Sequence, residues 1–133
     1  MDTSAEREQA FILTFEKAFN PEMDADTIYE YAVSNEVIKE SNFTRALFEE
    51  VCNKMPAIDG FIEEHSKSRA LGRISKVSLS VLRLAVCEIR YFENTPVGVS
   101  INEAVELTKK YGSEDEYAFV NGILGAFAKG ISE

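Results

Sequence analysis

The stretch of sequence that decides the fold runs from residue 81 to residue 124 and reads VLRLAVCEIRYFENTPVGVSINEAVELTKKYGSEDEYAFVNGIL. It begins with an apolar segment, which a proline and a glycine then interrupt. Ser100 stands three residues before Glu103, and Ser113 stands three residues before Glu116. This spacing is a capping box, in which the serine hydroxyl and the glutamate carboxylate satisfy unpaired amides at a helix start. The stretch therefore predicts three helices, the second opening at Ser100 and the third at Ser113.

The first of these helices, over about 77–92, is apolar on most of its faces. Such a helix is buried, so other helices must pack around it. Asn121 and Gly122 lie within a helical pattern and not between two alternating apolar runs, which excludes a hairpin there. We expect Gly122 to let another helix approach closely.

The rest of the chain also predicts helices. Apolar residues at helical spacing indicate a helix over 4–19, closed by an Asn-Pro pair. The remaining start signals are Asp24 or Asp26 for a short helix, Ser41 for a helix that ends near 54, Pro56 for the next helix, and Ser75 or Ser78 for the central helix.

Length and composition fit one domain. The chain has 133 residues, 45% of them hydrophobic, which suffices for a single core. No apolar run reaches the roughly 20 residues that span a bilayer, and the acidic N-terminus is unlike a secretory signal. Cys52 and Cys87 both lie in apolar helical settings, so we expect reduced core cysteines in a cytoplasmic protein without a membrane partner.

The charge is unevenly distributed. The chain carries a net charge of −9, which disfavours a polyanionic partner. Between residues 65 and 90, however, six basic residues face one acid, a net charge of +5, so the remainder carries −14. This basic band could hold a few phosphates or consist of solvated side chains around a helix joint. Arg83 is a candidate for an internal pair with an acid such as Glu103 or Glu106.

No pattern in the sequence supports catalysis. His65 is the one histidine and stands in a polar joint, where we expect it to be exposed to solvent. The sequence has no glycine-rich phosphate loop, no HExxH motif and no Cys/His cluster. We therefore expect a protein that is not an enzyme, with no catalytic residues, no metal site and no cofactor.

The segments VLRLAVCEI, INEAVELTKKYG and FVNGIL follow one another in an order and spacing that resemble the NusB family of bacterial transcription antitermination factors, closely over 71–124. The resemblance implies an all-α fold of about seven helices in two packed bundles around the buried central helix. We expect one domain over 1–133, with N-terminal helices over 4–55 and C-terminal helices over 56–131. The implied function is RNA-binding transcription antitermination on the boxA element of nascent ribosomal RNA. It acts with the ribosomal small-subunit protein NusE and helps the RNA polymerase antitermination complex to read through terminators.

The resemblance also implies RNA-binding residues. The arginine cluster that NusB proteins carry near the N-terminus is reduced here to Arg7, which is either a phosphate ligand or one half of an exposed ion pair with Glu8 or a neighbour. Asp115 and Phe119 map to the RNA-facing surface of the family. Asp115 could instead complement the helix dipole, and Phe119 could be core or stack on an unpaired base. From the basic band we add Lys67, Arg73 and Lys76.

Partner binding maps to Phe15 and Ser78, by their positions in the first helix and at the start of the central helix. Phe15 could be an exposed anchor for NusE or a core residue. Arg69 replaces a tryptophan that is common in relatives, so we expect its loop to open to solvent or to face an acid. The alternative to RNA binding is a helical protein-interaction module with weak or no RNA binding, and a homodimer that hides the RNA surface is a related expectation.

Overall fold

The computed structural model describes residues 3–132, and in this range it contains seven α-helices, one short 3-10 helix and no strand. The all-α prediction is therefore confirmed. The elements are α1 (Ser4–Phe19), α2 (Ala25–Ser34), α3 (Asn42–Asn53), α4 (Met55–His65), η1 (Leu71–Arg73), α5 (Lys76–Tyr91), α6 (Val97–Tyr111) and α7 (Glu114–Ser132).

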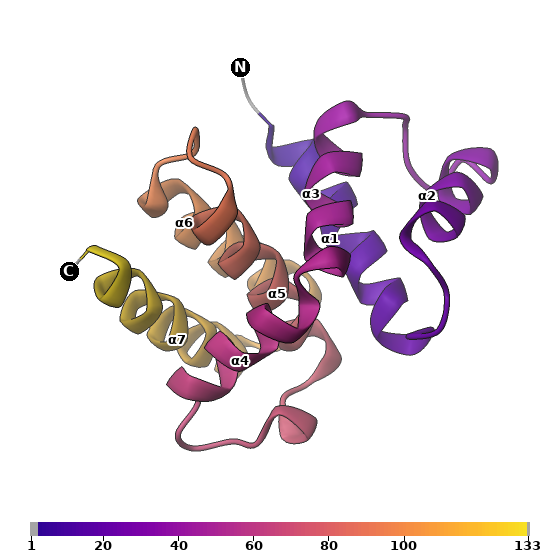
Figure 1. Ribbon diagram of the computed structural model, residues 1–133. Coiled ribbons are helices and arrows are strands. Elements are labelled where there is room, and N and C mark those ends of the chain that lie inside the picture. Colours follow the sequence, from indigo (N-terminus) through magenta and orange to yellow (C-terminus); the bar gives the residue numbers. More distant parts are fainter. Residues whose placement is uncertain (1–2, 133) are drawn as a thin grey trace.

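Helix α5 is the central helix, as predicted (Figure 1). It contacts α1 and α3 of the N-terminal half, and α4, α6 and α7 of the C-terminal half. Ten of its 16 residues are buried, among them Cys87. Cys52 on α3 is half-buried, and both cysteines are free thiols. Burial raises the pKa of the Cys52 thiol to about 11 and that of Cys87 further, so both stay protonated and inert at neutral pH.

Three helices begin where their capping residues predict. The side chains of Asp24, Ser41 and Ser75 accept hydrogen bonds from backbone amides three residues on, at 2.7, 3.2 and 3.1 Å. The carboxylate of Asp24 has a lowered pKa, because the hydrogen bond from Thr27 favours its charged form. Pro56 stands in the first turn of α4, where its missing amide costs nothing.

Helix α6 begins three residues earlier than predicted, and the capping box at Ser100 is wrong. Pro96 is the residue directly before the helix, and its carbonyl accepts from the Ser100 amide at 3.3 Å, which closes the first turn. Ser100 is therefore a buried interior residue, and its hydroxyl has no hydrogen-bond partner among the described residues. The Glu103 carboxylate binds Ser4 and Arg7 of α1 instead of its own helix start.

Helix α7 begins directly after Ser113, as predicted, but Glu116 does not complete a capping box there. The Ser113 carbonyl accepts from the Glu116 amide at 3.1 Å, while the Glu116 carboxylate extends to Ser78 and Arg69. The expectation for Gly122 is also wrong, because a side chain there would meet nothing within 4 Å.

The glycine that a close contact does require is Gly112, between α6 and α7. A Cβ atom at Gly112 would lie 3.0 Å from the Thr108 carbonyl and 3.3 Å from a methyl group of Val77 on α5. The joint between α6 and α7 therefore packs directly against the first turn of α5.

Two polar side chains have other surroundings than predicted. Arg83 does pair internally, but with Asp59 of α4 through two hydrogen bonds of 2.8 and 2.9 Å. His65 is half-buried at the end of α4, since its Nδ1 lies 2.9 Å from the Phe61 carbonyl and its ring packs edge-on against Phe127.

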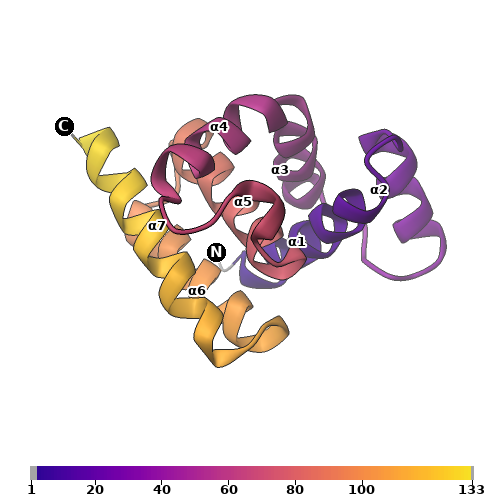
Figure 2. The ribbon, with the colours of Figure 1, turned by 90° about the horizontal axis from the view of Figure 1, so that it is seen from below.

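Helix α2 lies at the edge of the molecule, away from α5 (Figure 2). It packs on α1 and α3 through a small apolar cluster that is separate from the main core and includes Leu13, Ile28 and Phe48. Within residues 3–132, no helix is both long and apolar enough to cross a membrane.

Candidate nucleic-acid and partner interface

The joint between α4 and α5, residues 66–75, and the first turn of α5 together carry three exposed cations of the basic band. Its turn is fixed by the Ser66 hydroxyl, which donates to the Arg69 carbonyl at 2.7 Å, and by Ile74, which is buried. Lys67 and Arg73 in this joint, and Lys76 in the first turn of α5, are exposed. None of the three makes an ion pair with another described residue. An ordered joint with three free cations is suited to phosphate contacts.

Arg69 of the same joint connects three elements. Its guanidinium lies over the Phe119 ring of α7, 4.0 Å from the ring centroid. Its Nη1 lies 3.2 Å from the Glu116 carboxylate, and that carboxylate accepts a 2.8 Å hydrogen bond from the Ser78 hydroxyl of α5. The expectation that Arg69 faces an acid is therefore confirmed. We refer to Arg69, Ser78, Glu116 and Phe119 as the joint cluster.

The side chains of Phe119 and Asp115 differ in how far they are exposed to solvent. Phe119 is half-buried against the main core, and the Arg69 guanidinium lies over its ring. Asp115 is exposed in the first turn of α7, next to Glu114 and Glu116. Three acids in a first turn stabilise the positive end of the helix dipole. Asp115 therefore has a structural role as well as an accessible carboxylate.

Arg7 lies inside the protein, and the expected exposed pair with Glu8 is wrong. Its side chain is 5% exposed, and its guanidinium donates to both carboxylate oxygens of Glu88 on α5, at 2.8 and 2.7 Å. Glu103 of α6 lies 3.4 Å away. A phosphate ligand needs accessible donors, so this burial argues against direct phosphate contact by Arg7. The side chain instead ties α1 to α5 and α6.

Glu8, the neighbour of Arg7, has a different partner. Its carboxylate accepts from the Lys110 ammonium at 2.7 Å and from the Tyr111 hydroxyl, both at the end of α6. These two hydrogen bonds lower the pKa of the Glu8 carboxyl and raise that of the Tyr111 phenol. The contact fastens the first turns of α1 to the end of α6.

Phe15 and Ser78, the residues expected at the partner surface, differ in accessibility. Phe15 is half-buried in a row of aromatic rings, with Phe11 at 6.0 Å and the exposed Phe19 at 5.0 Å between centroids. The Tyr111 ring extends this row at 4.9 Å from Phe11. Ser78 is fully buried, and its hydroxyl is engaged by Glu116. Sequence reasoning missed Tyr111, although it stands within the quoted segment INEAVELTKKYG.

The fold and this surface define an all-α protein with a cationic joint and an aromatic row, suited to binding a polyanion and a protein partner. Among residues 3–132, no three His, Cys, Asp or Glu side chains gather as metal ligands.

The comparisons with known proteins identify the family. The NusB family profile matches residues 4–129, so the chain belongs to the NusB family. It is 38% identical over 132 residues to the transcription antitermination protein NusB of Ruminiclostridium cellulolyticum, covering 98% of this chain and 90% of the relative.

Solved structures of NusB proteins have the same fold as this chain. The NusB structure of T. maritima superposes with a TM-score of 0.87 and 31% identity, over 97% of this chain and 92% of that chain. A crystal structure of the antitermination factors NusB and NusE in complex with double-stranded RNA matches with a TM-score of 0.85 and 25% identity, over 96% of each chain.

Proposed function

We propose that this protein is an RNA-binding transcription antitermination factor that acts in the cytoplasm with NusE on boxA of nascent ribosomal RNA, within the RNA polymerase antitermination complex. The observation that carries the proposal is the exposure of Lys67 and Arg73 in the α4–α5 joint and of Lys76 in the first turn of α5, all three without an acidic partner among the described residues. Relatives that bear the NusB name and a NusB–NusE–RNA complex of the same fold support it.

In this proposal the protein is a scaffold and not an enzyme. The three cations hold phosphates, and the joint cluster offers a planar surface for an unpaired base. Since Arg69 lies over the Phe119 ring, a base on that side would stack on the guanidinium plane. Asp115 lies at the start of the same helix, α7, and its carboxylate can accept hydrogen bonds from base or ribose donors.

NusE supplies positive charge that this chain lacks. With a net charge of −9, the protein alone attracts RNA weakly, and a basic partner on the same RNA offsets that repulsion. Phe15 is the proposed anchor for NusE, because the exposed Phe19 extends its aromatic row to the surface. The buried Ser78 acts indirectly, by holding the Glu116 carboxylate of the joint cluster.

The experiment is fluorescence anisotropy of a short boxA RNA, titrated with the protein at 50 and 200 mM salt, with and without NusE. Three phosphate contacts to single-stranded RNA give a salt slope of about −2.1, so affinity falls about 18-fold over this range. We expect the variant with Lys67, Arg73 and Lys76 changed to alanine to lose this slope. Lys129→Ala, an exposed lysine near the end of α7, is the matched control and keeps it.

A protein-interaction module without RNA binding is the second candidate function, favoured by the buried Arg7 and the net charge of −9. No RNA binding in either arm, by a protein that is folded and still binds NusE, would establish this candidate and refute the first. The homodimer that covers the RNA surface is tested by sedimentation velocity in the same series, because it predicts that RNA and self-association compete.

A further inference from the structure

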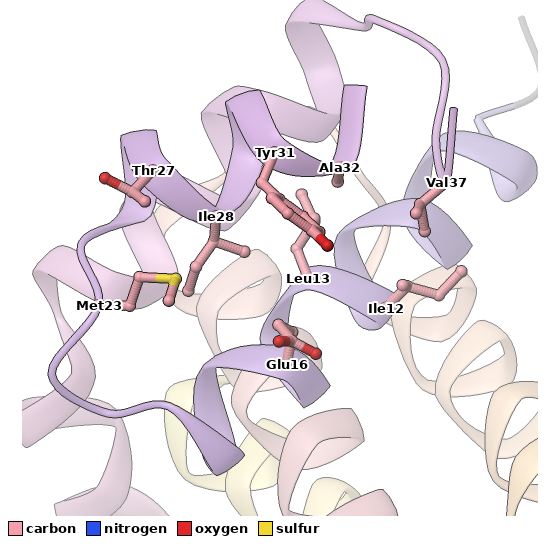
Figure 3. Close-up of a pocket in the computed structure, with 9 residues that line it drawn as sticks. All are labelled: Ile12, Leu13, Glu16, Met23, Thr27, Ile28, Tyr31, Ala32 and Val37. Carbon is pink, nitrogen blue, oxygen red and sulfur yellow. The ribbon is translucent and has the colours of Figure 1, made fainter. Parts of the chain in front are cut away.

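A groove of about 250 Å³ lies between α1 and α2, at the edge of the molecule and outside the joint cluster (Figure 3). Its volume exceeds that of a cavity of about 150 Å³ that accommodates a benzene ring. It therefore has room for one aromatic or two aliphatic side chains. Most of its lining is apolar, and the lining residues are Ile12, Leu13, Glu16, Met23, Thr27, Ile28, Tyr31, Ala32 and Val37.

The rim of the groove presents large apolar side chains to solvent. Tyr31 is 67% exposed and Val37 is 55% exposed, and Figure 3 shows both extending from α2 and the turn after it toward Ile12 on α1. The turn is held by the left-handed Glu36, with φ 58°, and by the Val37 amide, which donates to the Ala32 carbonyl at 2.8 Å. Val37 is therefore fixed at the rim by the backbone.

The charge around the groove is strongly negative. Residues 16–40, which include the rim, hold seven acids and two lysines, a net charge of −5. Five of these acids are exposed and form no salt bridge with another described residue. They are Glu16, Glu22, Asp24, Glu36 and Glu40. Glu16 lines the groove, and Glu22, Asp24 and Glu36 adjoin lining residues in the sequence.

We propose that this groove docks a basic amphipathic segment of a partner protein, which inserts one or two large apolar side chains between α1 and α2 and places lysines or arginines against the acidic rim. An apolar groove that receives an amphipathic helix is a common recognition mode, and complementary charge around it selects the partner. The groove is separate from the residues proposed to hold RNA, so this inference goes beyond the proposed function and does not depend on it.

Two other occupants fit the charge poorly. A second copy of this chain would place two surfaces of net charge −5 against each other, and such like-charge contact opposes association. RNA would be repelled for the same reason. The occupant is therefore cationic and apolar at once.

The test uses a fluorescein-labelled helical peptide of about 18 residues, with leucine and phenylalanine on one face and lysine on the other, titrated with the full chain. We expect saturable binding that weakens with salt, and amide shifts in 15N–1H spectra that map to α1 and α2. Tyr31→Ser should weaken binding at least about tenfold, because an aromatic anchor is lost at an exposed site that does not support the core. Ile131→Ser, an exposed apolar residue at the end of α7, is the matched control and should bind as the wild type does.

Charge is tested separately. Changing Glu16 and Glu36 together to glutamine should reduce the salt dependence, and a peptide with glutamate in place of lysine should not bind. Equal binding by the Tyr31→Ser and Ile131→Ser variants, or equal binding of the acidic peptide, would overturn the proposal. So would self-association in sedimentation velocity that Tyr31→Ser abolishes, because the occupant would then be a second copy.

Discussion

Replacement of Glu88 by glutamine tests the role that the structure gives to Arg7. Both side chains are almost fully buried, with 5% and 1% exposed, and they form two hydrogen bonds of 2.8 and 2.7 Å. Glu88→Gln keeps the shape of the side chain but removes its charge. The Arg7 guanidinium would then remain buried, with a Glu103 carboxylate oxygen 3.4 Å away.

The expected cost follows from this burial. Removing one partner of a buried ion pair costs up to about 3–5 kcal/mol, because the Arg7 guanidinium loses the carboxylate that holds it with two hydrogen bonds and keeps the longer contact to Glu103. At about 2.1 cal/mol/K of unfolding entropy per residue, a chain of this length loses about 3.6 °C of Tm for each kcal/mol. Glu88→Gln should therefore lower Tm by about 11–18 °C.

Calorimetry or thermal circular dichroism measures this shift. The control is Glu106→Gln, which removes an exposed partner of Lys109 at 3.8 Å and should cost less than about 1 kcal/mol. The double variant Arg7→Met/Glu88→Leu removes both charges and should recover most of the lost stability.

The double variant also separates stability from RNA binding. Well below its Tm it should bind boxA RNA with NusE as the wild type does, because the structure gives Arg7 a packing role. A Glu88→Gln variant that melts within about 3 °C of the wild type, as the exposed control is expected to do, would refute the packing role of the Arg7–Glu88 pair. Loss of RNA binding by a fully folded double variant would instead show that Arg7 contributes to RNA binding.

Three further predictions concern local packing, pH and thiols. Gly112→Ala should destabilise the protein by about 1–3 kcal/mol in urea unfolding, because the new Cβ would lie 3.0 Å from the Thr108 carbonyl. Gly122→Ala, at a helical position with open space around it, should stabilise by about 0.5–1 kcal/mol. Equal effects of the two substitutions would contradict the packing of the α6–α7 joint. The hydrogen bonds of Glu8 to the end of α6 lower its pKa, so its contribution to the free energy of unfolding is complete above pH 4.5 and lost as the pH falls through the folded pKa. The difference in unfolding free energy between wild type and Glu8→Gln should therefore shrink between about pH 5 and 3, and a constant difference would disprove this prediction. Cys87 should react with a thiol reagent at pH 8 only after unfolding, and rapid labelling of the native protein would show that the central helix is accessible.

Sequence alone determined the features that depend on near neighbours. The apolar pattern of α5 predicted its burial, and Ser41 predicted where α3 begins, while Ser75 was one of the two starts, with Ser78, predicted for α5. Periodicity and capping involve residues within a few positions of each other. The cations of the α4–α5 joint were also visible as an excess of positive charge over 65–90. Their exposure was not, because it depends on which acids the fold brings near.

Only the tertiary structure decided the pairings between distant residues. Arg7 meets Glu88 across 81 positions, and Glu116 leaves its expected capping box for Ser78 across 38 positions. The same capping pattern failed at Ser100, since a proline four residues earlier already started the helix. A carboxylate pairs with the cation or hydroxyl that packing places beside it in a buried position, because an unpaired charge is most costly there. The spatial distance between residues that are far apart in the chain cannot be read from a single sequence.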